Sequence, residues 1–207
     1  GAAVPATNEA AADLLPHRAA QIARLSQRLQ GAIGEQGTQT LIHGDLSPDQ
    51  VLLTPAPGPE EGEGPGALAS APQIRVVDLD RSGLGPRSVD LGSWLAACLL
   101  TDDQQQAEAF LAGYADRLPL PPAEQLAAWT ARALLSAALD PMRRYGENWL
   151  TKVEQRLDLA AAVLDRPQIL PLPPPSAVPG APGAGSTSAE TADAGPLHAE
   201  TADAGPF

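Results

Sequence analysis

Residues 43–50 read HGDLSPDQ, and residues 74–83 read IRVVDLDRSG. The first stretch places a histidine, a glycine and an aspartate in a polar turn, and Gln50 stands five positions after Asp45. The second stretch is a short apolar run that ends in the triplet Asp-Leu-Asp. Short apolar runs bounded by turn residues are typical of strands. The two stretches therefore predict short strands joined to turns that present carboxylate and amide side chains.

The pattern on either side of these turns is mostly helical. Apolar residues recur at helical spacing from Asn8, a plausible N-cap, to about Ile33, and again over roughly 88–100, 103–117, 121–139 and 147–165. Short strands are expected at 40–42, which should be buried, at 51–53 and at 74–79. We therefore expect an α+β fold, mostly helical, with a short β-hairpin that carries the polar turns.

Three segments differ in composition from this pattern. Residues 1–7 are interpreted as a linker, residues 55–72 as a flexible loop, and residues 167–207 as a disordered Pro/Gly/Ala-rich tail in which AETADAGP occurs twice. Such segments cannot bury enough apolar surface to offset the entropy of ordering. The folded domain is thus predicted to cover residues 8–166.

Composition and charge exclude several classes of protein. Of the 207 residues 43% are hydrophobic, which suits one globular domain, and the single cysteine excludes a disulfide framework or cysteine-based zinc site. The formal net charge of −12 argues against nucleic acid and against a membrane as partners. The sequence shows neither a secretory leader nor an apolar run long enough to cross a bilayer, so we expect a cytoplasmic protein.

Asp45, Gln50 and Asp78 are residue types that phosphoryl transfer to a hydroxyl requires. An aspartate must accept or orient the hydroxyl proton, and Mg²⁺ held by carboxylate and amide oxygens must bridge the nucleotide phosphates. A similar spacing relates the catalytic-loop Asp and Asn of protein kinases to the metal-binding Asp of their DFG motif. We therefore expect the three side chains to converge on one cleft.

The ordered motifs resemble those of the aminoglycoside phosphotransferase and choline kinase superfamily. Residues 43–50 resemble its H-G-D-x-x-x-x-N segment, residues 78–80 its D-[FWL]-[ED] strand end, and residues 85–92 its G-x-x-x-x-D-[LV] segment before a helix. The resemblance covers roughly residues 8–165. It implies a protein kinase-like C-terminal lobe, Mg²⁺ as cofactor, ATP or GTP as phosphoryl donor, and a small-molecule hydroxyl as acceptor.

The resemblance also implies a role for each motif residue. Asp45 is the expected catalytic base, and Gln50, Asp78 and Asp80 are the expected metal ligands. Gln50 stands where most members of the family have Asn, and its amide oxygen lies one methylene further out. A solvated surface carboxylate explains Asp80 equally well.

Two further residues are expected to support the site, and a set of acids is expected near the acceptor. His43 should hold the catalytic turn, and Asp90 should accept hydrogen bonds from backbone amides of the neighbouring loop or of a helix start. In the family, acceptor residues come from the helices after the metal-binding aspartate. Five acids of that region could meet a cationic acceptor, although solvated helix faces explain them equally well: Asp102, Asp103, Glu108, Asp116 and Asp140.

The N-terminal lobe of the family, with a nucleotide-covering loop and a phosphate-pairing lysine, has no counterpart in the sequence. One helix precedes His43, and the sole lysine is Lys152. We therefore expect that lobe to precede Gly1 in a longer product. The nucleotide-binding residues stay unknown, and residues 1–207 alone are expected to be inactive.

Two other functions fit parts of the pattern. A chain that lacks the nucleotide lobe in the cell would be a non-catalytic remnant or a binding module of the same fold. Asp78-x-Asp80 also matches the D-x-D motif of glycosyltransferases, but the strand–helix alternation of a Rossmann-like domain does not occur in the sequence. The acceptor itself is not predicted.

Overall fold

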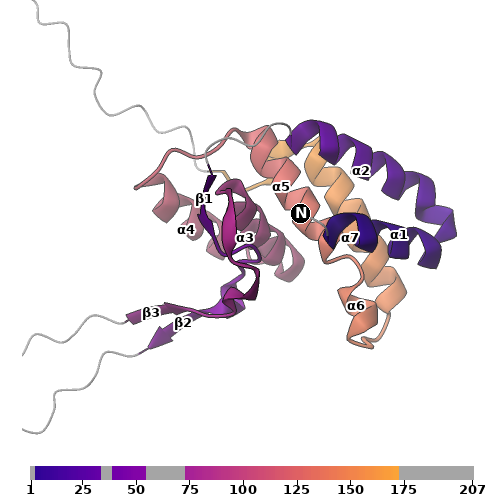
Figure 1. The fold of residues 1–207 in the computed structure, drawn as a ribbon, viewed down its shortest axis with the longest axis horizontal. Helices are drawn as coiled ribbons and strands as arrows, with labels where there is room; N and C mark the ends of the chain where they lie inside the picture. Colours follow the sequence, from indigo (N-terminus) through magenta and orange to yellow (C-terminus); the bar gives the residue numbers. More distant parts are fainter. Residues whose placement is uncertain (1–2, 34–38, 55–72, 173–207) are drawn as a thin grey trace, which may run out of the picture. The chain divides into compact units, whose positions relative to one another are not determined.

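The computed structural model describes residues 3–33, 39–54 and 73–172 (Figure 1). Its helices are α1 (Ala3–Leu14), α2 (Ala19–Ile33), α3 (Ser88–Thr101), α4 (Gln104–Ala115), α5 (Ala123–Ser136), α6 (Asp140–Arg143) and α7 (Trp149–Asp165). Its strands are β1 (Gln39–Ile42), β2 (Val51–Thr54), β3 (Gln73–Val76) and β4 (Gly83–Pro86). Short 3₁₀ helices are η1 (Pro16–Arg18), η2 (Pro48–Gln50), η3 (Leu79–Arg81) and η4 (Pro167–Ile169). The fold is thus α+β and mostly helical. The loop prediction for 55–72 and the tail prediction for 173–207 lie outside the described residues.

Helix α5 is the centre of the helical region. It packs against α1, α2, α3 and α7 (Figure 1). A helix that packs against several neighbours buries more than one of its faces. The buried residues of α5 are Leu126, Ala127, Ala128, Trp129, Thr130, Ala131, Leu134 and Leu135. Gly92 of α3 faces this helix, and a β-carbon there would lie 2.6 Å from the backbone carbonyl carbon of Trp129. The glycine therefore allows α3 and α5 to approach closely.

The N-terminal helical pattern forms two helices instead of one. Helix α1 begins at Ala3, within the segment interpreted as a linker, and Asn8 lies inside it. Pro16 opens η1, and α2 begins at Ala19. Proline has no backbone N–H and disfavours helical geometry in the residue before it, so a continuous helix cannot pass through this position. The predictions of a linker at 1–7 and of a helix start at Asn8 are therefore wrong.

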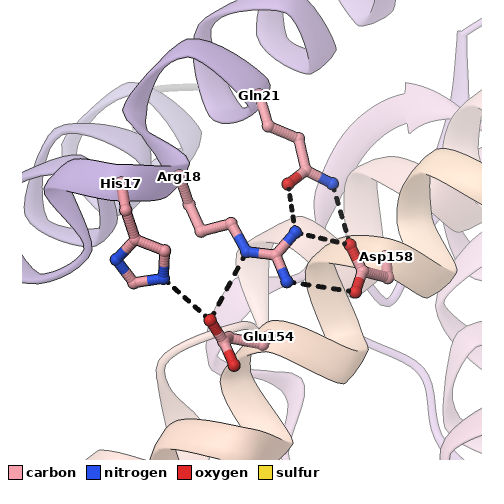
Figure 2. A network of polar contacts seen from close by, with 5 residues as sticks. All are labelled: His17, Arg18, Gln21, Glu154 and Asp158. Atoms are coloured by element: carbon pink, nitrogen blue, oxygen red, sulfur yellow. Dashed lines mark hydrogen bonds and ion pairs between the residues drawn. The ribbon is translucent and has the colours of Figure 1, made fainter.

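A polar network joins the start of α2 and the preceding η1 to α7 (Figure 2). Arg18 lies 3.4 Å from the Glu154 carboxylate and 3.1 Å from the Asp158 carboxylate. Gln21 accepts from Arg18 at 2.8 Å and donates to Asp158 at 3.0 Å. His17 Nε2 lies 2.8 Å from Glu154 Oε1. The network fixes the corner between α1 and α2 on α7, although exposed ion pairs contribute little to stability.

The chain stays packed beyond α7. Pro167 begins η4, and Leu170 is 3% exposed within the hydrophobic core. The predicted start of the tail at residue 167 is therefore too early. The neighbouring prolines dominate the local composition and obscure the buried leucine.

The strands form two separate antiparallel pairs, β1 with β4 and β2 with β3. Leu41 lies opposite Leu84 in the first pair, and Leu53 lies opposite Ile74 in the second. These four side chains are between 69% and 79% exposed. The expectation of a buried strand at 40–42 is therefore wrong. Strand β4 was not predicted, because its sequence Gly-Leu-Gly-Pro consists mostly of residues that are rare in strands.

Candidate phosphotransferase site

The HGD turn follows β1 and requires its glycine. Gly44 has a φ of +88°, and a β-carbon on it would lie 2.3 Å from the carbonyl oxygen of Arg81. Only glycine adopts such a φ without strain and also permits this close approach. The turn that carries Asp45 is therefore fitted against the backbone of the second turn.

Asp90, in the first turn of α3, holds the HGD turn in place. One carboxylate oxygen accepts a hydrogen bond from the backbone N–H of His43 and the other accepts from Gly44, each at 2.8 Å. A bidentate carboxylate on two neighbouring amides is a strong, charge-assisted contact. The turn is thus anchored to the helical core. The expected role of Asp90 as a support of the catalytic site stays a prediction.

His43 connects the HGD turn to the segment before Asp78. Its side chain is buried, and Nε2 lies 2.9 Å from the carbonyl oxygen of Val77. Because a carbonyl oxygen only accepts, Nε2 carries the proton of this bond. Nδ1 has no hydrogen-bond partner among the residues that the structure describes. This geometry favours the supporting role expected for His43 over that of an accessible base.

Gln50 links the two turns through its side chain and its backbone. Its Oε1 accepts from the backbone N–H of Ser47 at 3.1 Å, and its Nε2 donates to Asp78 Oδ2 at 3.3 Å. Its carbonyl oxygen accepts from the backbone N–H of Val77 at 3.0 Å. The orientation of the amide follows from its partners, because Ser47 N–H can only donate and the carboxylate accepts.

Asp78 lies where β3 has already ended. Its φ of 63° and ψ of 54° are left-handed, a conformation that Asp adopts more readily than most residues. The chain then enters η3, so Asp80 lies in a 3₁₀ turn instead of a strand. The prediction of a strand that reaches residue 79 is therefore wrong. Among the described residues, no hydrogen bond or ion pair joins Asp80 to Asp45, Gln50 or Asp78, and its role as a metal ligand stays a prediction.

Asp45 is half-exposed and pairs with Arg81 Nη1 at 2.9 Å. Partial burial raises the pKa of Asp45 above its usual range, and Arg81 and His43 act against this shift. The charges of Asp140 and Asp78 raise the pKa further. The contacts of His43 with Val77 and of Gln50 with Asp78 hold the two turns against each other, whereas the pairing with Arg81 and the influence of Asp140 were missed from sequence. An arginine in the second turn is the one signal that could have suggested the pair.

The oxygen atoms of Asp78 and Gln50 provide only part of a magnesium site. Carboxylates suit Mg²⁺, which is often held by one or two of them together with phosphate oxygens. Asp78 offers such a carboxylate, but the amide oxygen of Gln50 faces Ser47, so Gln50 must rotate before it can bind a metal. The described residues contain no group of three or more His, Cys, Asp or Glu side chains arranged for a metal. A metal here would therefore complete its coordination with water or with oxygens of a bound phosphate.

A cavity of about 380 Å³ lies elsewhere in the fold, between α2 and α7. It is lined by Arg18, Gln21, Arg24, Leu25, Arg28, Ala161 and Asp165. None of the motif residues lines this cavity. Its arginines are partly neutralised, since Arg28 lies 2.7 Å from Asp165. The motif geometry is therefore a better guide to the functional site than the size of this cavity.

Among the described residues, every helix is too short or too polar to span a membrane.

Comparison with known proteins agrees with the motifs. Residues 2–128 match the model of the phosphotransferase enzyme family, abbreviated APH. The matched segment spans more than half of the chain and includes Asp45, Gln50, Asp78 and Asp90. No curated protein matches the chain. The chain therefore belongs to the APH phosphotransferase enzyme family.

Proposed function

We propose that the chain forms the catalytic lobe of an ATP-dependent phosphotransferase that acts on a hydroxyl of a small molecule. The observation that carries this proposal is the contact between the two motif turns. Gln50 bonds to Asp78, His43 bonds to the carbonyl of Val77, and the half-exposed Asp45 lies beside them. A base and an acidic metal ligand on adjoining turns are what phosphoryl transfer requires. GTP is an alternative donor.

Asp45 acts as the base in this proposal. As the acceptor oxygen bonds to the γ-phosphorus, the bond from phosphorus to the bridging oxygen breaks, the nucleoside diphosphate leaves, and Asp45 takes the hydroxyl proton. Arg81 helps to keep the carboxylate ionised against the effect of burial. Asp90 and His43 hold the turn so that Asp45 keeps its position.

Asp78 is the proposed principal metal ligand. Gln50, once its side-chain amide has rotated, and Asp80 are proposed as further ligands because of the family resemblance. Magnesium, when bound, neutralises charge on the nucleotide phosphates. Without a bound metal, the hydrogen bond from Gln50 orients the Asp78 carboxylate.

A second lobe is part of the proposal. Phosphoryl transfer uses a cation on the nucleotide phosphates, and the one lysine of the chain, Lys152, is an exposed residue of α7. We infer that a lobe outside residues 1–207 covers the nucleotide. The folded part of the chain, from α1 to η4, would then correspond to the C-terminal lobe of a protein kinase-like fold.

The test is ATP turnover, followed by ³¹P NMR, by the product of the whole reading frame. Asp45→Asn should lower the rate by about 10²- to 10⁴-fold, the range typical of a lost general base, with an unchanged circular dichroism spectrum. Asp49→Asn, which removes the same charge from the same turn, is the matched control. Equal rates in the Asp45→Asn variant and the parent would refute the assignment of the base. ATP binding without turnover in the parent would instead identify a binding module of this fold.

A further inference from the structure

A row of polar residues on α2 and on the turn before it runs beside a row of acids on α7. The first row is Arg18, Gln21, Arg24 and Arg28, and the second is Glu154, Asp158 and Asp165. Residues three or four positions apart lie on one face of a helix, and so do residues two turns apart. Figure 2 shows the contacts at one end of the two rows.

The two rows are joined by ion pairs at both ends but not in the middle. Arg18 Nη1 lies 3.1 Å from Asp158 Oδ1, and Arg28 Nη1 lies 2.7 Å from Asp165 Oδ1. Between these two acids, the α7 residue that lines the cavity between the helices is Ala161. Alanine offers no side-chain acceptor. The middle of the acidic row therefore lacks a carboxylate.

Arg24 lies beside this gap, since it lines the same cavity as Ala161. Its side chain is exposed, and no described residue forms an ion pair or hydrogen bond with its guanidinium. Arginine stays protonated in proteins. Arg28 follows four positions later on the same helix, and like charges at that spacing repel each other. An anion placed next to Arg24 would therefore remove an unfavourable interaction.

The cavity has the size and the mixed lining of a small-molecule site. Its volume of about 380 Å³ falls within the range of roughly 300–1,000 Å³ that is usual for ligand pockets. Leu25, which is 4% exposed, and Ala161 supply apolar surface. The amide of Gln21 is already engaged, because it accepts from Arg18 and donates to Asp158. Arg24 is thus the cation that is free to bind a ligand.

We propose that this cavity binds a small organic anion, with one carboxylate or phosphate group beside Arg24 and a short apolar body over Leu25 and Ala161. A guanidinium binds either oxyanion through paired N–H donors. Arg28 has N–H groups besides the one that faces Asp165, and these provide a second contact. None of the motif residues lines the cavity, so this is a second site, and it does not depend on the proposed phosphotransferase activity.

The experiment titrates the chain with four probes and follows its backbone amide and arginine Nε–H signals by NMR. The probes are butyrate, butyl phosphate, inorganic phosphate and butylamine. Butyrate or butyl phosphate should cause saturable shifts at residues 21–28 and 161–165, and the tighter of the two identifies the anionic group. Inorganic phosphate should bind more weakly, because it lacks the apolar body. Butylamine should cause no saturable shift there, because it is a cation.

Two pairs of variants test the charge of the cavity, and circular dichroism checks that each variant is folded. Arg24→Gln should raise the Kd of the tighter probe about tenfold or more, as expected for lost charge-assisted hydrogen bonds. Arg117→Gln, which removes an exposed arginine after α4, should leave the Kd unchanged. Ala161→Asp supplies the missing carboxylate and should also raise the Kd. Ala161→Asn, its neutral isostere, should raise it much less.

Several results would overturn the inference. Neither butyl anion causes saturable shifts at the cavity, or butylamine binds as tightly as they do. Inorganic phosphate binds as tightly as the better butyl anion, which would remove the apolar part of the site. Arg24→Gln has no more effect than Arg117→Gln, or Ala161→Asp and Ala161→Asn weaken binding equally. Saturable shifts centred on residues 43–50 and 77–81 would place the anion at the motif turns instead.

Discussion

The helices and the strands of this chain differ in what holds them in place. Leu126 and Leu134 in α5 have no exposed surface, whereas Leu53 and Ile74 in the β2–β3 pair are 71% and 69% exposed. The helices therefore bury their apolar side chains against one another. The turns next to the strands depend on polar contacts such as that of Asp90 with Gly44. The difference teaches that the helical region provides the stability and that the candidate site is attached to it by a few hydrogen bonds.

The largest stability difference is expected between two leucines. Leu134→Ala should lower the free energy of unfolding by about 2–5 kcal/mol, because it leaves a cavity in the core. Leu53→Ala, at an exposed strand position, should change it by no more than about 0.5 kcal/mol. Urea denaturation of both variants measures the two values. Similar losses in the two variants would show that the strands are as well packed as the helices.

A second pair of substitutions tests close packing within the helices. Gly92→Ala should destabilise the chain by about 1–3 kcal/mol, because overpacking forces α3 away from α5. Gly113→Ala in α4 meets no atom within 4 Å, and alanine should stabilise that helix by about 0.5–1 kcal/mol. Thermal unfolding gives both values. A stabilised Gly92→Ala variant would contradict the described contact between α3 and α5.

The attachment of the catalytic turn is tested by Asp90→Ala. The variant leaves the N–H groups of His43 and Gly44 without their carboxylate acceptor, and it should weaken the turn by about 1 kcal/mol or somewhat more. Amide hydrogen exchange should speed up at these two residues while the amides of α5 stay protected. Asp116→Ala is the control, since Asp116 is an exposed residue with ordinary helical geometry at the end of α4. Uniform loss of protection would mean that Asp90 supports the whole fold.

The smallest effect concerns the network in Figure 2. The hydrogen bond from His17, followed by the contacts of Arg18, lowers the pKa of Glu154. A carboxyl with a lowered folded-state pKa stabilises the fold above its unfolded-state pKa, and this contribution is lost as the pH falls through the folded-state pKa. His17→Gln should move the pKa of Glu154 back toward its usual value in a ¹³C carboxyl titration. An unchanged titration would show that the contact does not persist in solution.

The sequence predicts the parts of the fold in which pattern and burial agree. Helices α3, α4, α5 and α7 follow their apolar periodicity closely, because each buries a face in the core. Pro16 was overlooked within an otherwise regular stripe. The short helix α6 lies between the two helices predicted at 121–139 and 147–165 and was not predicted. Apolar runs suggested buried strands, but Leu41, Leu53 and Ile74 are exposed in the structure.

The motif spacing of the candidate site could be predicted from the sequence, but its charge pairing could not. The separation of five residues between Asp45 and Gln50 indicated one turn. The pairing of Asp45 with Arg81 depends on the left-handed backbone at Asp78, which turns the chain into η3. The influence of Asp140 depends on how α6 follows α5. Neither feature has a periodic signal in the sequence.

The central claim is that the turns around Asp45 and Asp78 form a metal-dependent phosphoryl-transfer site. The most direct measurement is a titration of the chain with Mn²⁺, a paramagnetic substitute for Mg²⁺, followed through the broadening of backbone amide signals. The broadening should be strongest at residues 44–50 and 77–81, and Asp78→Asn should remove it while Asp102→Asn does not. Broadening centred on residues 102–116, or broadening that persists unchanged in the Asp78→Asn variant, would contradict the claim.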